Sequence, residues 1–271
     1  MLQVLKYFSL IGAALVILIP PYVIIVNAFK GSAEYIASGK FAFPHSFLNF
    51  ENFLKVIDLG HLGLAFYNTG FIIFFSLLAN VLLGTMVSYS LGRFDFRLKP
   101  IIFGGYIAAT FIPQITTQIA TFGVIHSLGL FNTKGAAILL YSGTDVVQIY
   151  LYLQFIRNIP YALDESAMIE GASLLKIYRS IIFPLLAPAT ATVIILKTIS
   201  IYNDLFTPYL YMPAQQLAVV STMLFKFAGP RSSHWELICA AIIFILIPTA
   251  LLYLFLQRYI FSGIVSGSVK E

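Results

Sequence analysis

Long stretches of the chain carry no charged residue, and their lengths are the first structural signal. A helix needs about 20 apolar residues to cross the roughly 30 Å hydrocarbon core of a bilayer. The uncharged segments predict six membrane-spanning helices at about 7–29, 66–91, 101–125, 136–156, 185–211 and 237–257. Asp145 interrupts the fourth segment, and Lys197 and Asp204 interrupt the fifth. The expected fold class is therefore an all-α polytopic membrane protein, with residues 1–271 in a single transmembrane domain.

The first segment has a basic residue ahead of it, as a secretory signal peptide does. Its apolar stretch is longer than a typical signal peptide core, and no small-residue cleavage site follows Pro20-Pro21. We expect a retained membrane helix.

Composition agrees with this pattern and excludes several classes of protein. Hydrophobic residues make up 59% of the chain and charged residues 10%, against roughly 45–50% and 25% in soluble domains. A soluble monomer, a disordered chain and a coiled coil are thereby excluded. The single cysteine, Cys239, lies in an apolar segment and excludes a disulfide framework.

The basic residues predict the orientation, because cytoplasmic loops are enriched in Lys and Arg. With the N-terminus inside, nine basic residues fall on the inner side: Lys6, Arg93, Arg97, Lys99, Arg157, Lys176, Arg179, Arg258 and Lys270. Six fall outside, mostly in two long connections: Lys30, Lys40, Lys55, Lys134, Lys226 and Arg231. Both termini are expected in the cytoplasm. The net charge of +5 therefore reflects membrane orientation, and we expect no nucleic-acid partner.

One inner connection, residues 158–184, has the character of folded structure. Asn158 is placed to cap a helix whose first turn holds Pro160, with acidic residues close behind. Gly171 permits the backbone to turn out of that helix. A second helical stretch is expected over 173–182, ended by Pro184. Such a hairpin is either a docking surface or a cover for helix ends.

The residue order of this hairpin favours docking. Glu165-Ser166-Ala167, Glu170-Gly171-Ala172, Ile181 and Phe183-Pro184 resemble the EAA loop of bacterial ABC importer permeases. Ser166 stands in place of the first Ala, and Glu170 in place of the usual Asp.

The resemblance extends along most of the chain. Residues 201–208, Ile-Tyr-Asn-Asp-Leu-Phe-Thr-Pro, are similar to the Trp-Asn-Asp/Glu-Phe stretch of carbohydrate-type permeases, with Tyr202 in place of Trp. Residues 257–271 resemble the C-terminus of those permeases, with Ser268 and Glu271 as departures. The best match is the maltose-type second permease, which implies the six-helix type I ABC importer fold.

The resemblance also implies partners. The chain has no P-loop, since Gly39-Lys40 lacks both the earlier Gly and the following Ser or Thr. ATP and Mg²⁺ are then expected on a separate pair of ATPase subunits, with no cofactor in this chain and no enzymatic activity of its own. A second permease subunit, an extracytoplasmic sugar-binding protein and the lipid of the bacterial cytoplasmic membrane complete the expected surroundings.

In the EAA loop, the helix 161–170 is expected to lie in a groove of the ATPase. Glu165 would pair with or cap ATPase groups, Ala167 would permit close approach, and Gly171 would fix the turn. The expected ATPase-coupling residues are Glu165, Ala167, Glu170, Gly171, Ala172 and Pro184.

Polar residues in the apolar segments predict a substrate pathway, because ionisable groups in a membrane face a cavity or one another. On one continuous helix, Lys197, Ser200, Asn203, Asp204, Thr207 and Tyr211 would lie within about 120°. Pro208 removes the hydrogen-bond donor to the Asp204 carbonyl and suits a helix broken beside a cavity.

In the fourth segment, Tyr141, Asp145, Gln148 and Tyr152 would share one face. Carboxylates, amides and aromatic rings are the groups that bind sugars. The expected pathway residues are Asp145, Gln148, Tyr152, Lys197, Asn203, Asp204 and Thr207. The alternative is that they satisfy one another or join two permeases.

The sequence gives less support to other sites and functions. Pro113 predicts a kink in the third segment, which serves equally well as a gate or a packing seam. The four histidines show no metal-ligand spacing. An ion-coupled secondary transporter, an ABC permease for a non-sugar solute and a membrane-embedded enzyme are the alternatives, and the last lacks a catalytic grouping.

Overall fold

The computed structural model describes residues 2–228 and 234–268, without the side chains of Leu2, Gln114, Leu252, Tyr253 and 255–268. Arg231 and Lys270, which entered the charge balance, lie outside the described residues. The side chains of the C-terminal motif at 257–268, Arg258 among them, also lie outside the described part.

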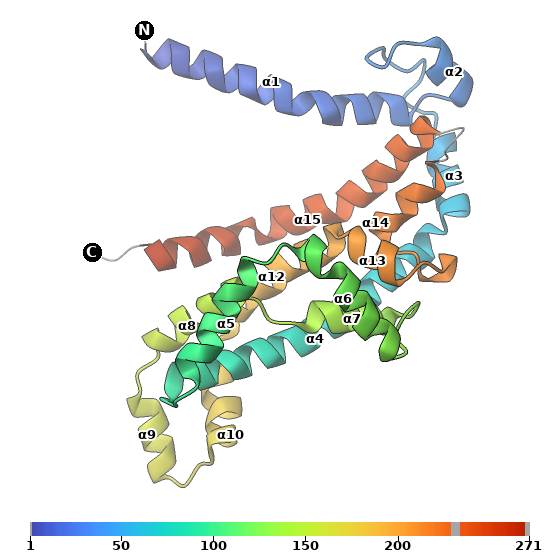
Figure 1. Ribbon diagram of the computed structural model, residues 1–271. Helices are drawn as coiled ribbons and strands as arrows, with labels where there is room; N and C mark the ends of the chain where they lie inside the picture. Colours follow the sequence, from blue (N-terminus) through green and yellow to red (C-terminus); the bar gives the residue numbers. More distant parts are fainter. Residues whose placement is uncertain (1, 229–233, 269–271) are drawn as a thin grey trace. The chain divides into compact units, whose positions relative to one another are not determined.

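Helices and their connections make up the described part of the chain, in which no β-strand occurs (Figure 1). The α-helices are α1 Leu2–Ala28, α2 Ser32–Ala37, α3 Glu51–Gly60, α4 Leu62–Arg93, α5 Lys99–Thr110, α6 Gln114–Ser127, α7 Lys134–Ser142, α8 Val146–Asn158, α9 Ala162–Ile169, α10 Leu174–Ile177, α11 Phe183–Leu185, α12 Ala187–Asn203, α13 Phe206–Tyr211, α14 Val220–Met223 and α15 Trp235–Ser268. A π-helical turn, Tyr178–Ile182, joins α10 to α11.

Two of these helices, over Gln3–Ala28 and Leu62–Arg93, are long and apolar enough to cross a membrane. Two further spans are possible if bent pairs of helices are each counted once. These are α7 with α8, bent by 46°, and the helical segment Leu174–Leu185 with α12, bent by 71°. The described residues therefore offer two to four candidate spans by length and composition.

The chain divides into two compact units, residues 1–67 with 218–252 and residues 68–217 with 253–271. In the first unit, the end of α1 is held by the segment that follows it. The Asn52 amide donates to the carbonyls of Ala28 (2.8 Å) and Lys30 (2.7 Å). The buried Lys30 ammonium donates to Asn27 Oδ1 and to the carbonyl of Gly39. Because helix ends leave carbonyls without partners, these bonds fix residues 29–60 as ordered structure.

In the second unit, α4 packs closely on α8 through small residues. Gly84, Ser88 and Gly92 are four apart and share one face of α4. A Cβ on Gly84 would collide with the side-chain amide of Gln148, and one on Gly92 would lie 2.8 Å from Ile156 Cγ2. Small residues at this spacing allow two helix backbones to approach in a membrane.

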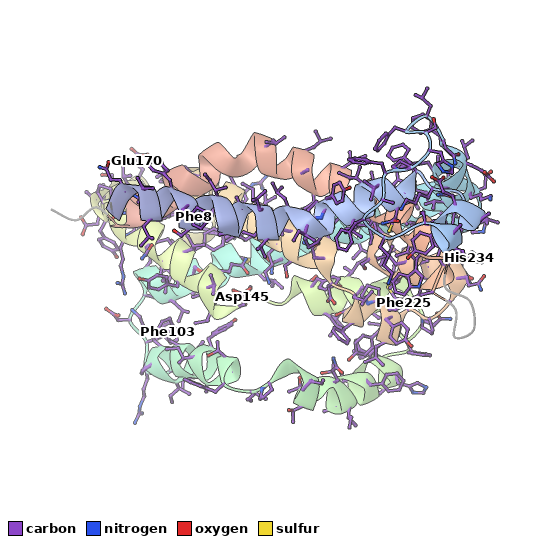
Figure 2. The ribbon with its side chains drawn as sticks, turned by 90° about the horizontal axis from the view of Figure 1, so that it is seen from above. Phe8, Phe103, Asp145, Glu170, Phe225 and His234 are labelled. Carbon is purple, nitrogen blue, oxygen red and sulfur yellow. The ribbon has the colours of Figure 1, made fainter. Side chains whose placement is uncertain are left out.

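Three of the predicted membrane segments are broken, two of them where a proline indicated a kink or a break. The stretch 101–125 is split at Phe111–Pro113, where the predicted kink is confirmed. The stretch 136–156 is split at Gly143–Asp145, and Figure 2 shows Asp145 at the connection between α7 and α8. The stretch 185–211 is split at Asp204-Leu205, four residues before Pro208, whose ring and missing N–H break a helix at that position.

The hairpin of residues 158–184 differs from its prediction at both ends. Asn158 does not cap the hairpin helix but is the last residue of α8, because Ile159 and Pro160 leave the helical path. The helix α9 begins at Ala162 instead. Pro184 does not end the second arm, since it occupies the first turn of α11, where proline is tolerated.

Replacing Gly84 by Leu tests the close packing of α4 on α8. The new side chain would overlap with Gln148 and Tyr152, which are both buried, and we expect a loss of about 1–3 kcal/mol of stability. The measurement is thermal unfolding of the purified protein in detergent. Gly105→Leu is the matched control, because among the described residues no atom lies within 4 Å of a Cβ placed there. Equal stabilities of the two variants would contradict this packing.

Candidate functional site

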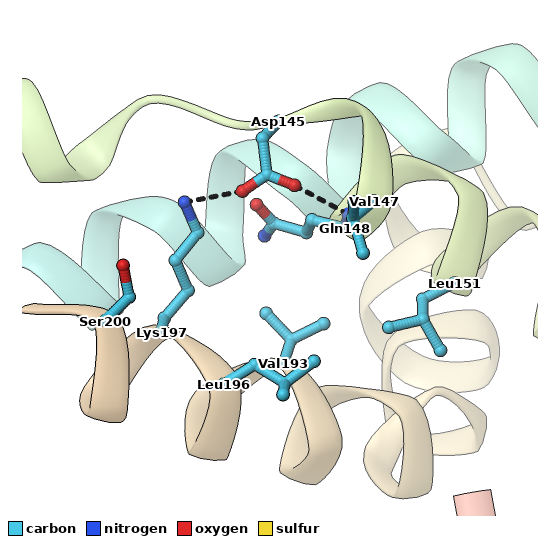
Figure 3. A pocket seen from close by; sticks show the side chains of 8 residues that line it. All are labelled: Asp145, Val147, Gln148, Leu151, Val193, Leu196, Lys197 and Ser200. Atoms are coloured by element: carbon cyan, nitrogen blue, oxygen red, sulfur yellow. Dashed lines mark hydrogen bonds and ion pairs between the residues drawn. The ribbon is translucent and has the colours of Figure 1, made fainter. Parts of the chain in front are cut away.

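A cavity of about 220 Å³ lies between the first turns of α8 and the middle of α12 (Figure 3). Its walls combine four polar side chains with four apolar ones: Asp145, Gln148, Lys197, Ser200, Val147, Leu151, Val193 and Leu196. Three of the predicted pathway residues, Asp145, Gln148 and Lys197, are therefore brought to one place.

Asp145 is placed in this cavity by its role at the end of a helix. It is the N-cap of α8, and one carboxylate oxygen accepts a hydrogen bond from the backbone N–H of Gln148 at 2.9 Å. The other oxygen lies 2.7 Å from the ammonium of Lys197 on α12 (Figure 3). The side chain of Asp145 is 48% exposed and that of Lys197 20%. The pair bridges two helices while leaving part of the carboxylate accessible from the cavity.

Two hydrogen bonds join α4 to the same region. The Asn80 amide donates to the carbonyl of Gly143 at 2.7 Å, in the break between α7 and α8. The amide of Gln148 donates to the carbonyl of Asn80 at 3.2 Å. A freed backbone carbonyl thus finds a partner inside the protein, as an apolar environment requires.

The other predicted pathway residues lie elsewhere. Tyr152 does not share an accessible face with Asp145, because it is fully buried among Tyr89, Ile156 and Tyr178. The break between α7 and α8 separates Tyr141 from Asp145, the N-cap of α8, and from Gln148 and Tyr152 in that helix. Asn203 is exposed and donates to the carbonyl of Ile199 in its own helix at 2.9 Å.

Asp204 and Thr207 form a separate polar cluster at the break between α12 and α13. The Asp204 carboxylate accepts from the backbone N–H groups of Phe206 (2.8 Å) and Thr207 (3.2 Å). It also accepts from the hydroxyls of Thr207 (2.6 Å) and Tyr141 (2.9 Å). Because the helix is interrupted here, Lys197 and Asp204 do not belong to one continuous stripe.

The hairpin α9–α10 has the sharp turn that the sequence predicts. Gly171 follows α9 with a φ of +80°, in the left-handed region that favours glycine. The hydroxyl of Ser173 caps the next helix by accepting from Lys176 N. Glu165 and Glu170 are exposed on this hairpin, and Figure 1 shows α9 and α10 side by side beyond the end of α4.

Ala167 and Ala172 face their own protein. Ala167 is buried and Ala172 packs against the same hydrophobic core, which contains Ile177 and Ile182. The small side chain of Ala167 therefore permits close packing inside this chain. It is not exposed on the side where a partner was expected to approach.

The sequence did not predict one buried ion pair in this region. Arg93, at the end of α4, lies 3.0 Å from Asp164 in α9, and both side chains are buried. The sequence did hold a signal, because Asp164 sits in the first turn of a helix, where an acid is favourable. The separation of the two residues along the chain concealed the contact. Within the described residues, no group of three or more His, Cys, Asp or Glu side chains could hold a metal ion.

The sequence is similar to permeases of sugar transport systems along nearly its whole length. It is 32% identical over 254 residues to the melibiose/raffinose/stachyose import permease MelC of Bacillus subtilis, covering 93% of this chain and 91% of that protein. It is 31% identical to AmyC of Thermoanaerobacterium thermosulfurigenes, a probable permease for starch degradation products, with the same coverage. The multiple sugar-binding transport system permease MsmG of Streptococcus mutans is 30% identical, with 98% of this chain and 96% of that protein covered.

The fold agrees with these relatives. It is similar to a chain of a bacterial ABC transporter that imports the acidic polysaccharide alginate, with a TM-score of 0.76, 21% identity and coverage of 94% of this chain and 96% of that chain. No protein-family model matches the sequence. On the strength of its relatives, the chain belongs to the permease subunits of carbohydrate ABC importers, which are membrane-embedded transport subunits and not enzymes.

Proposed function

We propose that the protein is one permease subunit of an importer that moves a sugar or short oligosaccharide across a bacterial cytoplasmic membrane by alternating access. The relatives are named for melibiose, raffinose and stachyose, for starch degradation products and for multiple sugars, which favours this substrate class over a non-sugar solute. The observation that carries the proposal is the exposed, rigidly turned hairpin α9–α10, which suits a docking role. Membership of an ABC importer family argues against a secondary transporter.

The proposed topology has six spans with both termini in the cytoplasm. Each broken pair, α5 with α6, α7 with α8 and α12 with α13, is counted as one span, alongside α1, α4 and α15. Irregular backbone at membrane depth is tolerated where it is buried or lines a cavity. The side-chain partners at the α7–α8 and α12–α13 breaks support this assignment.

The proposed assembly contains a second permease, two ATPase subunits and an extracytoplasmic sugar-binding protein. A structure of the alginate transporter, at 18% identity and a TM-score of 0.53, is described as a complex with a periplasmic protein carrying an alginate pentasaccharide. ATP and Mg²⁺ would be bound by the ATPase subunits, and this chain would hold no cofactor. We expect no nucleic-acid partner.

The hairpin is proposed to couple this chain to the ATPase. Glu165 and Glu170 are the groups available to a partner, because both are exposed on the α9 side of the hairpin. Gly171 sets the turn through its positive φ. Ala167 and Ala172 would keep the hairpin packed on its own core, and Pro184 would start α11, where it is exposed.

The cavity between α8 and α12 is the proposed sugar pathway. Its carboxylate, amide, ammonium and hydroxyl groups can exchange hydrogen bonds with sugar hydroxyls, and its apolar wall can face C–H groups. Asn203, Asp204 and Thr207 would form a second polar position along the path, with Asp204 also holding the break. Tyr152 would support the site from the core.

Gly171→Asp and Glu165→Lys test the coupling role. Gly171→Asp adds a negative charge at the turn of the hairpin, next to the exposed Glu170, and Glu165→Lys reverses an exposed charge. We expect both variants to lose sugar uptake in cells while inserting in the membrane at the normal level, measured with labelled sugar and immunoblots.

Gly171→Asn and Asp95→Lys are the matched controls for this experiment. Asn tolerates the left-handed region as Asp does but adds no charge, so it should keep part of the uptake. Asp95 is almost fully exposed outside the hairpin, so its reversal should leave uptake unchanged. Normal uptake by both Gly171→Asp and Glu165→Lys would refute the coupling assignment.

Ser200→Cys tests the pathway by chemical labelling. The native Cys239 is buried, so Cys239→Ala provides a background without a competing thiol. In the assembled importer, a thiol-specific reagent should modify Cys at position 200 and block uptake, because this position lines the cavity.

Ile194→Cys in the same background is the control, since Ile194 is 38% exposed on α12 but does not line the cavity. Its modification should leave uptake intact. If uptake survives complete modification at position 200, the cavity is not part of the pathway.

A further inference from the structure

The guanidinium of Arg93 contacts the start of the hairpin at three points. It lies 3.0 Å from the Asp164 carboxylate in the first turn of α9. It donates to the carbonyl of Ile159 at 3.0 Å, between α8 and α9. It also lies 5.7 Å from the centre of the Tyr161 ring, within the range of a cation–π contact. Both polar contacts come from one terminal nitrogen, Nη2, while the planar guanidinium faces the Tyr161 ring.

Burial makes this contact hard to break. The side chain of Arg93 is 7% exposed and that of Asp164 is 4%. Separating the pair would leave an uncompensated charge out of water, which is strongly unfavourable. The first arm of the hairpin is therefore fixed to the end of α4.

The second arm contacts the same helix. The hydroxyl of Tyr178 shares a hydrogen bond of 2.7 Å with the hydroxyl of Thr85, and both groups are buried. The ring of Tyr178 also lies 5.5 Å from that of Tyr89. Thr85, Tyr89 and Arg93 are four residues apart, so they follow one face of α4 over about 12 Å.

The covalent connections of the hairpin are less direct. Residues 159–161 join α8 to α9 without helical structure. On the other side, the π-helical turn Tyr178–Ile182 precedes a 71° bend into α12. Bends and π-helical turns are places where a helix deforms. The buried core that contains Ile177, Ile182 and Ala189 packs around the second joint. The contacts with α4 add a direct connection from both arms of the hairpin to a further helix.

We propose that α4 is the helix that the hairpin moves, and that Arg93 and Asp164 are the positioning residues of this transmission. The inference rests on the proposed docking of α9 to an ATPase. The middle of the same helix contacts a wall of the cavity, because Asn80 bonds to Gly143 and to the cavity residue Gln148. A displacement of α4 is thereby passed to the helix that carries Asp145, and the Thr85–Tyr178 bond is the second contact on this route.

The test measures sugar uptake and ATP hydrolysis together in proteoliposomes that contain the whole importer. Asp164→Asn removes the ion pair, and Arg93→Lys keeps the charge but loses the planar guanidinium that faces Tyr161. We expect both variants to assemble with the ATPase and to hydrolyse ATP within about twofold of the unmodified importer, while sugar transported per ATP falls about tenfold. The exchanged pair Arg93→Asp with Asp164→Arg should recover part of that ratio.

Asp95→Asn is the matched control, because it removes a carboxylate paired with Lys99 at 2.8 Å just beyond α4. The hydrogen bond from Lys99, and then its charge, lower the pKa of Asp95, so the control also removes an ionised group. In Asp95→Asn, the ratio of sugar transported to ATP hydrolysed should equal that of the unmodified importer. Tyr178→Phe, which deletes one hydroxyl, is expected to lower the ratio and serves as the test if Asp164→Asn does not assemble.

Two results would overturn the inference. One is an unchanged ratio of transport to hydrolysis in Asp164→Asn or, if that variant does not assemble, in Tyr178→Phe. The other is a parallel loss of uptake and hydrolysis in proportion to the assembled complex, which indicates a structural role alone. If Gly171→Asp transports sugar normally, the hairpin is not the coupling element, and the coupling role given under the proposed function is wrong. If Gly171→Asp is inactive and the ratio in Asp164→Asn is unchanged, only the role of α4 fails.

Discussion

Backbone groups that leave a helix in an apolar environment need partners inside the protein, and the second unit is organised around that requirement. Where α7 gives way to α8, Asn80 bonds the freed carbonyl of Gly143, and Asp145 accepts from the first turn of the new helix. At the next break, Asp204 does the same for α13. The polar residues at these breaks thus satisfy backbone groups, whatever else they contact.

The same requirement explains why α4 is continuous. Its residues 80–93 supply one bond to a break, a face of small residues for α8 and two polar contacts to the hairpin. An interruption within this stretch would displace all of these contacts together. The break between α7 and α8 therefore depends on an unbroken neighbouring helix.

The sequence could predict those helices, breaks and turns that depend on residues close together in the chain. Uncharged segments located most helices, Pro208 indicated a break, and Gly171 indicated a left-handed turn that the structure confirms. It could not predict contacts between distant segments. The orientation of Tyr152 and Ala167 toward the core depends on packing against other elements. The ion pair of Arg93 with Asp164 joins positions that no local pattern relates. The breaks separate Tyr141 from Gln148 and Thr207 from Lys197, pairs that an uninterrupted helix would place on one face.

Asp145 both caps α8 and pairs with Lys197. These two interactions restrict which residues can replace it in the wall of the cavity. A substitution there changes a helix end as well as a wall, so few residue types can satisfy both demands. Val147, Leu196 and Ser200 line the same cavity and hold no capping position. Substitutions at these three positions can therefore change the size or polarity of the cavity without removing the cap of α8.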